Sequence, residues 1–127
     1  MTLQRTMFQL YLKGCDEAIE LYKKAFDAEV GEIHRNIEDG TVMHAEMNAF
    51  GQCVAFSERK TETMAGNTMQ MCFHFGGEES DKVAVREAYE VLKDGADVHF
   101  PLGFTEWSSL VFGLVDRFGV NWCLFVQ

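Results

Sequence analysis

The stretch MFQLYLKGCDEAIELYKKAF, residues 7–26, combines a short apolar strand with an amphipathic helix. Residues 7–12 are apolar or aromatic apart from Gln9, as in a buried strand, and Lys13-Gly14 ends them. Acidic residues follow at positions 16 and 17 and suit a helix N-terminus. Over residues 18–26 the apolar side chains recur at helical spacing, which predicts one packed helix face.

Three further strands are predicted after this helix. They span residues 30–36, 42–50 and 52–58, and the turn Glu38-Asp39-Gly40 and Gly51 separate them. The resulting order is βαβββ.

The same order recurs in the second part of the chain. A strand at 68–75, a helix at 80–93 and strands at 98–100, 109–116 and 120–126 repeat it, and AEV (28–30) and FG (50–51) return as ADV and FG 68 residues later. We therefore predict an α+β fold for one 1–127 domain, made of halves 1–60 and 66–127. The halves should form a curled, mainly antiparallel eight-stranded sheet around a cleft, with the helices on its outer face.

Composition narrows the function classes. The chain has 127 residues, of which 20 are acidic and 11 are basic, and 47% are hydrophobic. This excludes a disordered chain, and the net charge of −9 argues against nucleic acid and anionic membranes as partners. No export signal or membrane-length apolar run is visible, so we expect a cytoplasmic protein with reduced thiols at Cys15, Cys53, Cys72 and Cys123.

Alternation along the strands divides the side chains between two faces. Phe8, Leu10 and Leu12 are expected beneath the first helix, and Met43, Ala45 and Met47 are expected on the packing side of their strand. The opposite face then carries mixed side chains, as a ligand cleft requires: Gln9, Tyr11, His44, Glu46, Cys72, His74 and Cys123. A face that is simply wet is the alternative.

The segments GCDEAIELY (14–22), MHAE (43–46), TEW (105–107), FG (112–113) and VDRFGVNW (115–122) carry a family resemblance. With the tandem βαβββ order, the chain resembles the vicinal oxygen chelate (glyoxalase/bleomycin resistance/dioxygenase) superfamily, and within it the PhnB-like branch labelled "3-demethylubiquinone-9 3-methyltransferase". The resemblance implies a paired sheet around a cleft and a homodimer. No glycine-rich turn for a methyl donor is present, so we interpret that label as a family name.

Metal-using members of this superfamily hold a divalent ion with four ligands, typically His and Glu. The resemblance carries those positions to Met7, Ala55, Gln70 and Cys123, and only Cys123 is a plausible ligand there. The sequence therefore predicts neither a metal nor another cofactor. The alternative is a divalent-metal-dependent lyase or dioxygenase with a displaced ligand set.

The function expected first is binding of a small organic molecule. His44 and Glu46, with His74 and Cys123, could make an acid–base or metal site, or His44 and Glu46 could bond locally or line a dimer seam. The cysteines are expected to be small buried hydrophobes unless His74 activates one. Trp107, beside Glu106, suits either a lid or a dimer contact, and a scaffold dimer with a filled cleft is a third hypothesis. The cleft residues to test are Gln9, Tyr11, His44, Glu46, Cys72, His74, Trp107 and Cys123.

Overall fold

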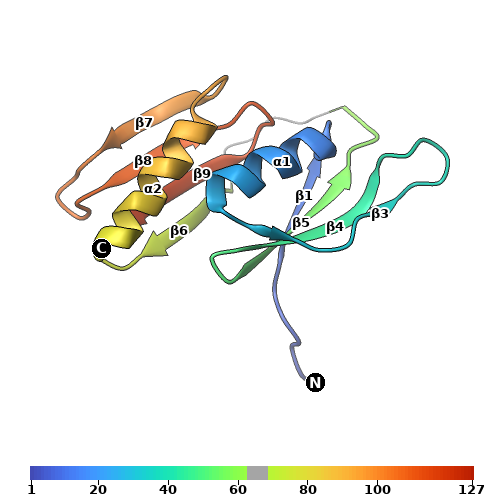
Figure 1. The fold of residues 1–127 in the computed structure, drawn as a ribbon, viewed down its shortest axis with the longest axis horizontal. Coiled ribbons are helices and arrows are strands. Elements are labelled where there is room, and N and C mark those ends of the chain that lie inside the picture. The colour runs from blue at the N-terminus through green and yellow to red at the C-terminus, as the bar shows by residue number, and fades with distance from the viewer. Residues whose placement is uncertain (63–68) are drawn as a thin grey trace. The chain divides into compact units, whose positions relative to one another are not determined.

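The structure is a computed structural model that describes residues 1–62 and 69–127. The chain forms two compact units, residues 1–63 and 64–127, and each packs one helix on one sheet (Figure 1). The boundary predicted at residue 66 and the first residue of the strand predicted at 68–75 lie outside the described residues. The α+β fold class is confirmed.

The first unit contains β1 (Phe8–Leu12), α1 (Cys15–Phe26), β2 (Glu29–Val30), β3 (His34–Arg35), β4 (Val42–Ala49) and β5 (Gln52–Glu58). Its sheet has the order β1-β5-β4-β2, and β3 also pairs with β4. The β1–β5 pair is parallel, whereas the other pairs are antiparallel.

The second unit contains β6 (Met71–Phe75), α2 (Glu79–Leu92), β7 (Asp97–Gly103), β8 (Val111–Val115) and β9 (Asn121–Val126). The order of its sheet, β6-β9-β8-β7, matches that of the first unit strand for strand. The β6–β9 pair is parallel and the others are antiparallel, so the mainly antiparallel pairing is confirmed.

The two helices begin in different ways. The residue before α1 is Gly14, whose φ of 83° is costly for other residues. The carboxylate of Glu58, at the end of β5, accepts hydrogen bonds from the N–H groups of Gly14 and Cys15 at 2.8 and 3.0 Å. By contrast, Glu78 and Asp81 form a reciprocal capping box at the start of α2. The first backbone N–H groups of α1 are therefore bonded by a residue of the sheet, whereas those of α2 are bonded by residues of the helix start itself.

Aromatic side chains fill the layer between helix and sheet in both units. In the first unit the Tyr22 ring lies 5.9 Å from Phe26 and 5.8 Å from Phe56, and all three are buried. In the second, Phe73 and Trp122 lie 5.9 Å apart and Tyr89 of α2 packs on Phe112 of β8 at 5.2 Å. Figure 1 shows α2 lying across β8 and β9. Each helix thus covers one face of its own sheet, and the opposite face, which we term the open face, carries no helix of that unit in the described part of the chain.

The strand predicted at 30–36 is wrong: it is two short strands, β2 and β3, so residues 1–62 and 69–127 contain nine strands in place of eight. Val30 pairs with Met47 and His34 with His44, so four residues along the strand oppose three on β4. The extra residue interrupts the ladder. The strand predicted at 98–100 is longer than expected, because β7 continues to Gly103.

Two expected core residues are also exposed. Both Phe8 and Leu12 lie on the edge strand β1, but Phe8 begins it and is 42% exposed, whereas Leu12 adjoins the start of α1 and is 7% exposed. Met43 is 52% exposed. Near it the alternation of β4 breaks, since Val42 and Ala45 are both buried, and this turns Met43 outward. Within residues 1–62 and 69–127, neither helix is long and apolar enough to cross a membrane.

Candidate functional site

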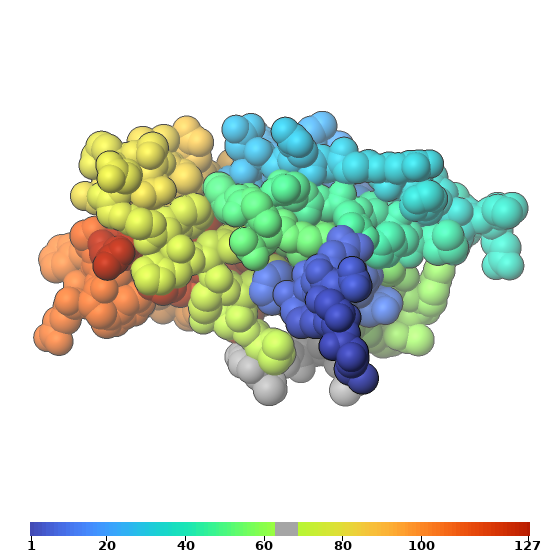
Figure 2. All heavy atoms as spheres, turned by 90° about the horizontal axis from the view of Figure 1, so that it is seen from below, coloured from blue at the N-terminus to red at the C-terminus, as the bar shows by residue number. Residues whose placement is uncertain are grey.

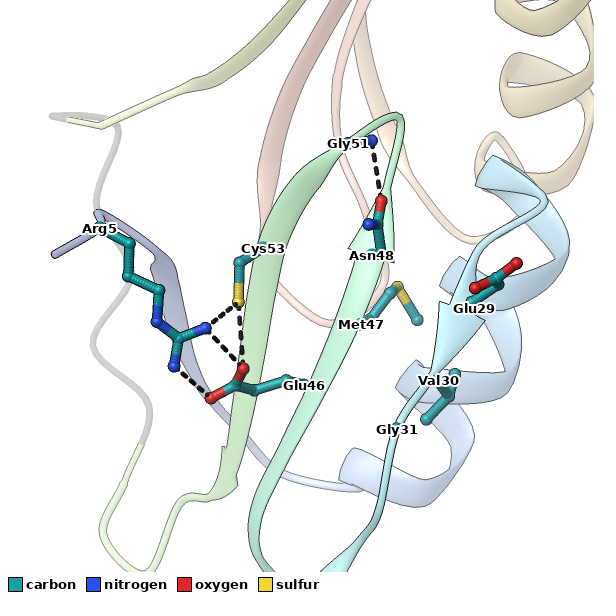
Figure 3. Close-up of a pocket in the computed structure, with 9 residues that line it drawn as sticks. All are labelled: Arg5, Glu29, Val30, Gly31, Glu46, Met47, Asn48, Gly51 and Cys53. Carbon is teal, nitrogen blue, oxygen red and sulfur yellow. Dashed lines mark hydrogen bonds and ion pairs between the residues drawn. The ribbon is translucent and has the colours of Figure 1, made fainter.

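The open face of the first unit carries a group of interacting polar side chains, Arg5, His44, Glu46 and Cys53, which we term the charged cluster. Arg5 donates from Nη1 and Nη2 to the two carboxylate oxygens of Glu46 at 2.8 and 3.0 Å. Nε2 of His44 lies 2.9 Å from Glu46 Oε2. The Cys53 thiol lies 3.5 Å from both Arg5 Nη1 and Glu46 Oε1 (Figure 3). The Glu46 carboxylate therefore contacts all three other members of the cluster.

The contacts within the charged cluster shift the pKa values of Glu46 and Cys53 in opposite directions. Hydrogen bonds from Arg5, and then from His44, lower the pKa of Glu46 to about 2. Partial burial and the adjacent Glu46 carboxylate raise the pKa of the Cys53 thiol. At neutral pH the cluster therefore holds an ionised carboxylate beside a protonated thiol, which gives Cys53 little nucleophilic character.

A pocket of about 380 Å³ lies beside the charged cluster, within the size range of small-molecule sites. Figure 3 shows Arg5, Glu46 and Cys53 on one side of it and the short strand β2 on the other. Its lining residues are Arg5, Glu29, Val30, Gly31, Glu46, Met47, Asn48, Gly51 and Cys53.

Sequence reasoning missed Arg5. It precedes β1 and belongs to no predicted element, so no periodicity marked it, although it pairs with a residue 41 positions away. Figure 2 shows the N-terminal residues, in dark blue, at the surface of the first unit beside its green strands. Only the path of this segment brings the guanidinium to Glu46.

The other predicted residues of the first unit are separate from this pocket. Gln9 donates from Nε2 to Ser57 Oγ at 2.9 Å, so its amide is partly satisfied within the sheet. Tyr11 is exposed, and its backbone carbonyl accepts a hydrogen bond from Arg59. The local contact of His44 with Glu46 is present. The grouping of that pair with His74 and Cys123 stays a prediction, because those residues belong to the other unit.

The open face of the second unit carries three rings, His74, Phe125 and Trp107, which we term the aromatic cluster. His74 on β6 stacks on Phe125 on β9 with 4.4 Å between ring centroids and 13° between planes. The Trp107 indole meets Phe125 edge-on at 5.3 Å and 85°. Thr105 Oγ accepts hydrogen bonds from the N–H groups of Trp107 and Ser108, which fixes the loop that carries the indole. His74 and Trp107, which were both predicted as cleft residues, thus both contact Phe125, which was not among the predicted residues.

The predicted cysteines of this unit lie directly opposite each other. Cys72 on β6 pairs in register with Cys123 on the parallel strand β9. Burial and, after it, the neighbouring Cys72 raise the pKa of Cys123 to about 11. Cys72 is exposed and its Sγ lies 3.5 Å from Gln70 Oε1. Among the described residues no hydrogen bond joins His74 to either cysteine, and its raised pKa keeps Cys123 a protonated thiol at neutral pH.

A polar row borders the thiols. Asn121 Oδ1 accepts from Gln70 Nε2 at 3.1 Å and lies 3.2 Å from His99 Nε2. The His99 ring lies over Gly113, where an added Cβ would be only 2.7 Å from its Cε1 atom. This row orients amide and imidazole groups on the open face, and the Cys72–Cys123 pair lies between it and the aromatic cluster.

The residues at the four positions implied for a divalent metal do not fit that ion. Met7 lies before β1 and Ala55 offers no ligand atom, while the Gln70 amide already bonds Asn121. Of the four residues, only Cys123 has a side chain that is a plausible ligand for such an ion. Across residues 1–62 and 69–127, no group of three or more His, Cys, Asp or Glu side chains is arranged to hold a metal ion. A hard divalent ion therefore has no ligand set of the family kind here.

Comparison with known proteins agrees with this architecture. A PhnB protein from Bacillus cereus, whose description also carries the 3-demethylubiquinone-9 3-methyltransferase label, is 25% identical and superposes with a TM-score of 0.81, covering 98% of this chain and 100% of its own. Protein PA1353 from Pseudomonas aeruginosa has a TM-score of 0.81 at 19% identity, covering 99% and 98%. A search of curated proteins gave no match.

A fosfomycin resistance protein, FosX, from Listeria monocytogenes shares the fold at 15% identity, with a TM-score of 0.71 and coverage of 100% of this chain and 95% of its own. Another structure of that protein contains Mn(II) and sulfate. The profile of the Glyoxalase/Bleomycin resistance protein/Dioxygenase superfamily matches residues 3–124, nearly the whole sequence. The chain therefore belongs to the Glyoxalase/Bleomycin resistance protein/Dioxygenase superfamily.

Proposed function

We propose that this protein binds a small, planar organic molecule on its open sheet faces, without the four-ligand metal of its metal-using relatives. The observation that carries this proposal is the aromatic cluster of the second unit. A 60% exposed indole beside a stacked His–Phe pair is a large apolar surface left in contact with water. Such surfaces on soluble domains commonly mark binding sites.

The geometry of the cluster favours a flat ligand. Phe125 has His74 parallel to it and Trp107 perpendicular to it, so the rings present both a face and an edge. Aromatic partners prefer offset-stacked and edge-to-face arrangements, each contributing about 0.5–1.5 kcal/mol beyond buried area. The polar row of Gln70, His99 and Asn121 supplies the few hydrogen-bonding groups that orient a ligand in an otherwise apolar site.

The fluorescence of Trp107 can report binding of a ligand to the aromatic cluster. Of its two tryptophans, Trp107 is 60% exposed and Trp122 is fully buried beneath α2. A thermal-shift screen of small aromatic and sugar-like compounds supplies candidates. We expect planar aromatic compounds to raise the melting temperature and to quench the Trp107 emission. Trp107→Phe removes that quenching and leaves the emission of Trp122 as the reference.

Affinity measured by calorimetry completes the test. Trp107→Ala and His74→Ala should each weaken binding about two- to tenfold, as expected for loss of one aromatic pair. Ile37→Ala, at a fully exposed position of the first unit, is the matched control and should leave the affinity unchanged. The proposal is overturned if no aromatic compound shifts the melting curve, or if both ring variants bind as tightly as the parent.

We also propose that the protein is a cytoplasmic homodimer. The resemblance to the PhnB-like branch supports the dimer, and the sequence supports the compartment. Sedimentation equilibrium should give twice the mass of 14.4 kDa at micromolar concentration, and a monomer across the whole concentration range would contradict it. Cell fractionation tests the compartment.

A further inference from the structure

We propose that Cys72 and Cys123 together bind one soft, thiophilic metal ion in two-coordinate geometry. This site is independent of the proposed binding of an organic molecule. It uses different atoms and a different probe, so either proposal can fail while the other stands.

The two thiols are brought together by the sheet. Cys72 and Cys123 are register partners on the parallel strands β6 and β9, and both project from the face opposite α2. Their flanking partners, Met71 with Trp122 and Phe73 with Leu124, are buried on the helix side. Strand alternation therefore holds the two sulfur atoms on the same side of neighbouring strands, about 4.8 Å apart at the backbone. The site needs no rearrangement of the backbone to form.

Access and contact also suit a shared ligand. Cys72 is exposed, so an ion can reach the pair from solvent, whereas Cys123 is half-buried and lies between apolar residues of β9. The two cysteines are register partners on adjacent strands, and the proximity of Cys72 adds to the raised pKa of Cys123. Cys15 and Cys53 have no cysteine as a strand partner.

The donor set decides which class of ion the pair can hold. Thiolates select soft ions, whereas zinc requires four ligands in a structural site. No third His, Cys, Asp or Glu completes a cluster with these thiols in the part of the chain that the structure describes. Two sulfur ligands alone suit an ion that is stable with two, such as Hg(II) or Cu(I).

Binding requires no oxidant or reductant. Each S–H bond breaks heterolytically, the two protons pass to solvent, and each sulfur uses the electron pair left behind to form one bond to the metal. With Hg(II) the two thiolates neutralise both positive charges. A neutral product suits the half-buried position of Cys123, where burial disfavours an isolated thiolate.

The test uses Hg(II) as the probe, added anaerobically to the reduced full-length protein in the presence of excess glutathione. Native mass spectrometry counts the ions retained, and ultraviolet thiolate-to-metal absorption reports their ligands. We expect one Hg(II) per chain, with loss of two protons. Cys72→Ser and Cys123→Ser should each weaken retention by about 10²–10⁴-fold, because the second thiol then no longer acts at high effective concentration.

Cys53→Ser and Cys15→Ser are the matched controls, since each removes one thiol outside the pair. They should retain the ion as the parent does, and Zn(II) should not bind in any of the proteins. Cys72 is exposed, so Cys72→Ser keeps the test decisive even if Cys123→Ser fails to fold. The proposal is overturned if Cys72→Ser holds Hg(II) as tightly as the parent, or if either control loses it.

Discussion

The two units share one strand order but carry different chemistry on their open faces. In the first unit Ala55 lies opposite Gln9 across the parallel strand pair, and Cys123 lies opposite Cys72 at the matching place in the second. One step further, Ser57 opposite Tyr11 corresponds to Phe125 opposite His74. The first face is thus largely polar and carries the charged cluster, whereas the second is aromatic and sulfur-rich.

This difference shows that the two faces of a strand are subject to separate constraints. Residues toward the helix are apolar in both units, because the helix must bury its stripe against them. Alternate residues do not contact the helix, so they can differ between units without altering the sheet. The two units therefore share one strand order, while the open face of the first carries charged side chains and that of the second carries aromatic and cysteine side chains.

The largest expected difference concerns the turn that precedes the last strand of each unit. Asp116 is buried and accepts hydrogen bonds from the N–H groups of Phe118 and Val120 and from the Trp122 indole, the last at 2.7 Å. Asn48, 68 residues earlier in the chain, is exposed, and its side-chain oxygen accepts one hydrogen bond, from the Gly51 N–H. Asp116→Ala should lower the free energy of unfolding by about 3 kcal/mol, since it leaves three donors unsatisfied.

Asn48→Ala is the matched variant for this prediction and should cost about 1 kcal/mol. Urea unfolding monitored by far-ultraviolet circular dichroism measures both. Equal losses in the two variants would mean that the two turns contribute alike, contrary to the comparison.

An intermediate effect is expected at the central position of β4 and β8. Glu46 opposite Ala55 corresponds to Gly113 opposite Cys123. Gly113→Ala places a methyl group against His99 and should cost about 1 kcal/mol through displacement of that ring from Asn121. Denaturation of Gly113→Ala, alone and combined with His99→Ala, measures this. If His99→Ala does not remove most of the additional cost, the ring is not the obstacle.

The smallest effect on stability should come from Arg5, and it should depend on pH. The pKa of Glu46 is about 2 in the folded protein, against an ordinary 4.5. A lowered carboxyl pKa stabilises the fold above the ordinary value, and this contribution disappears as pH falls from about 4.5 toward 2. Arg5→Ala should raise the Glu46 pKa toward 4.5 and abolish most of this dependence.

A carbon-13 NMR titration of the Glu46 carboxyl group measures the effect directly. Arg35→Ala, which breaks the ion pair with Asp16 in the same unit, is the control and should leave the Glu46 titration where it is. A Glu46 midpoint that does not move in Arg5→Ala would refute the assignment of Arg5 as the main cause.

Much of the fold was predictable because its signals are local. Apolar spacing in residues 18–26 and the glycines at 51 and 119 mark the helix and the turns without reference to the rest of the chain. The broken strand between Val30 and His34 was not predictable. Its interruption depends on the register against β4, and no residue within 30–36 signals that register.

The candidate site was predictable to a lesser degree. Alternation placed Cys72 and His74 on the open side of β6, where both are exposed. It also placed Phe125 on the open side of β9, but it could not show that this ring joins His74 to Trp107, because those contacts depend on the register of β6 against β9 and on the path of the loop before β8. Arg5 carried no sequence signal, because a single basic residue in an N-terminal segment has no period or spacing.

By itself the sequence determined the strand and helix order, its repetition, the family resemblance and which side chains lie opposite the helices, because periodicity and turn residues act over short distances. The tertiary structure alone decided the partners of those side chains. Strand register set Cys72 against Cys123, and the path of the first seven residues set Arg5 against Glu46. Such contacts join residues more than 40 positions apart, and their geometry depends on the whole sheet between them.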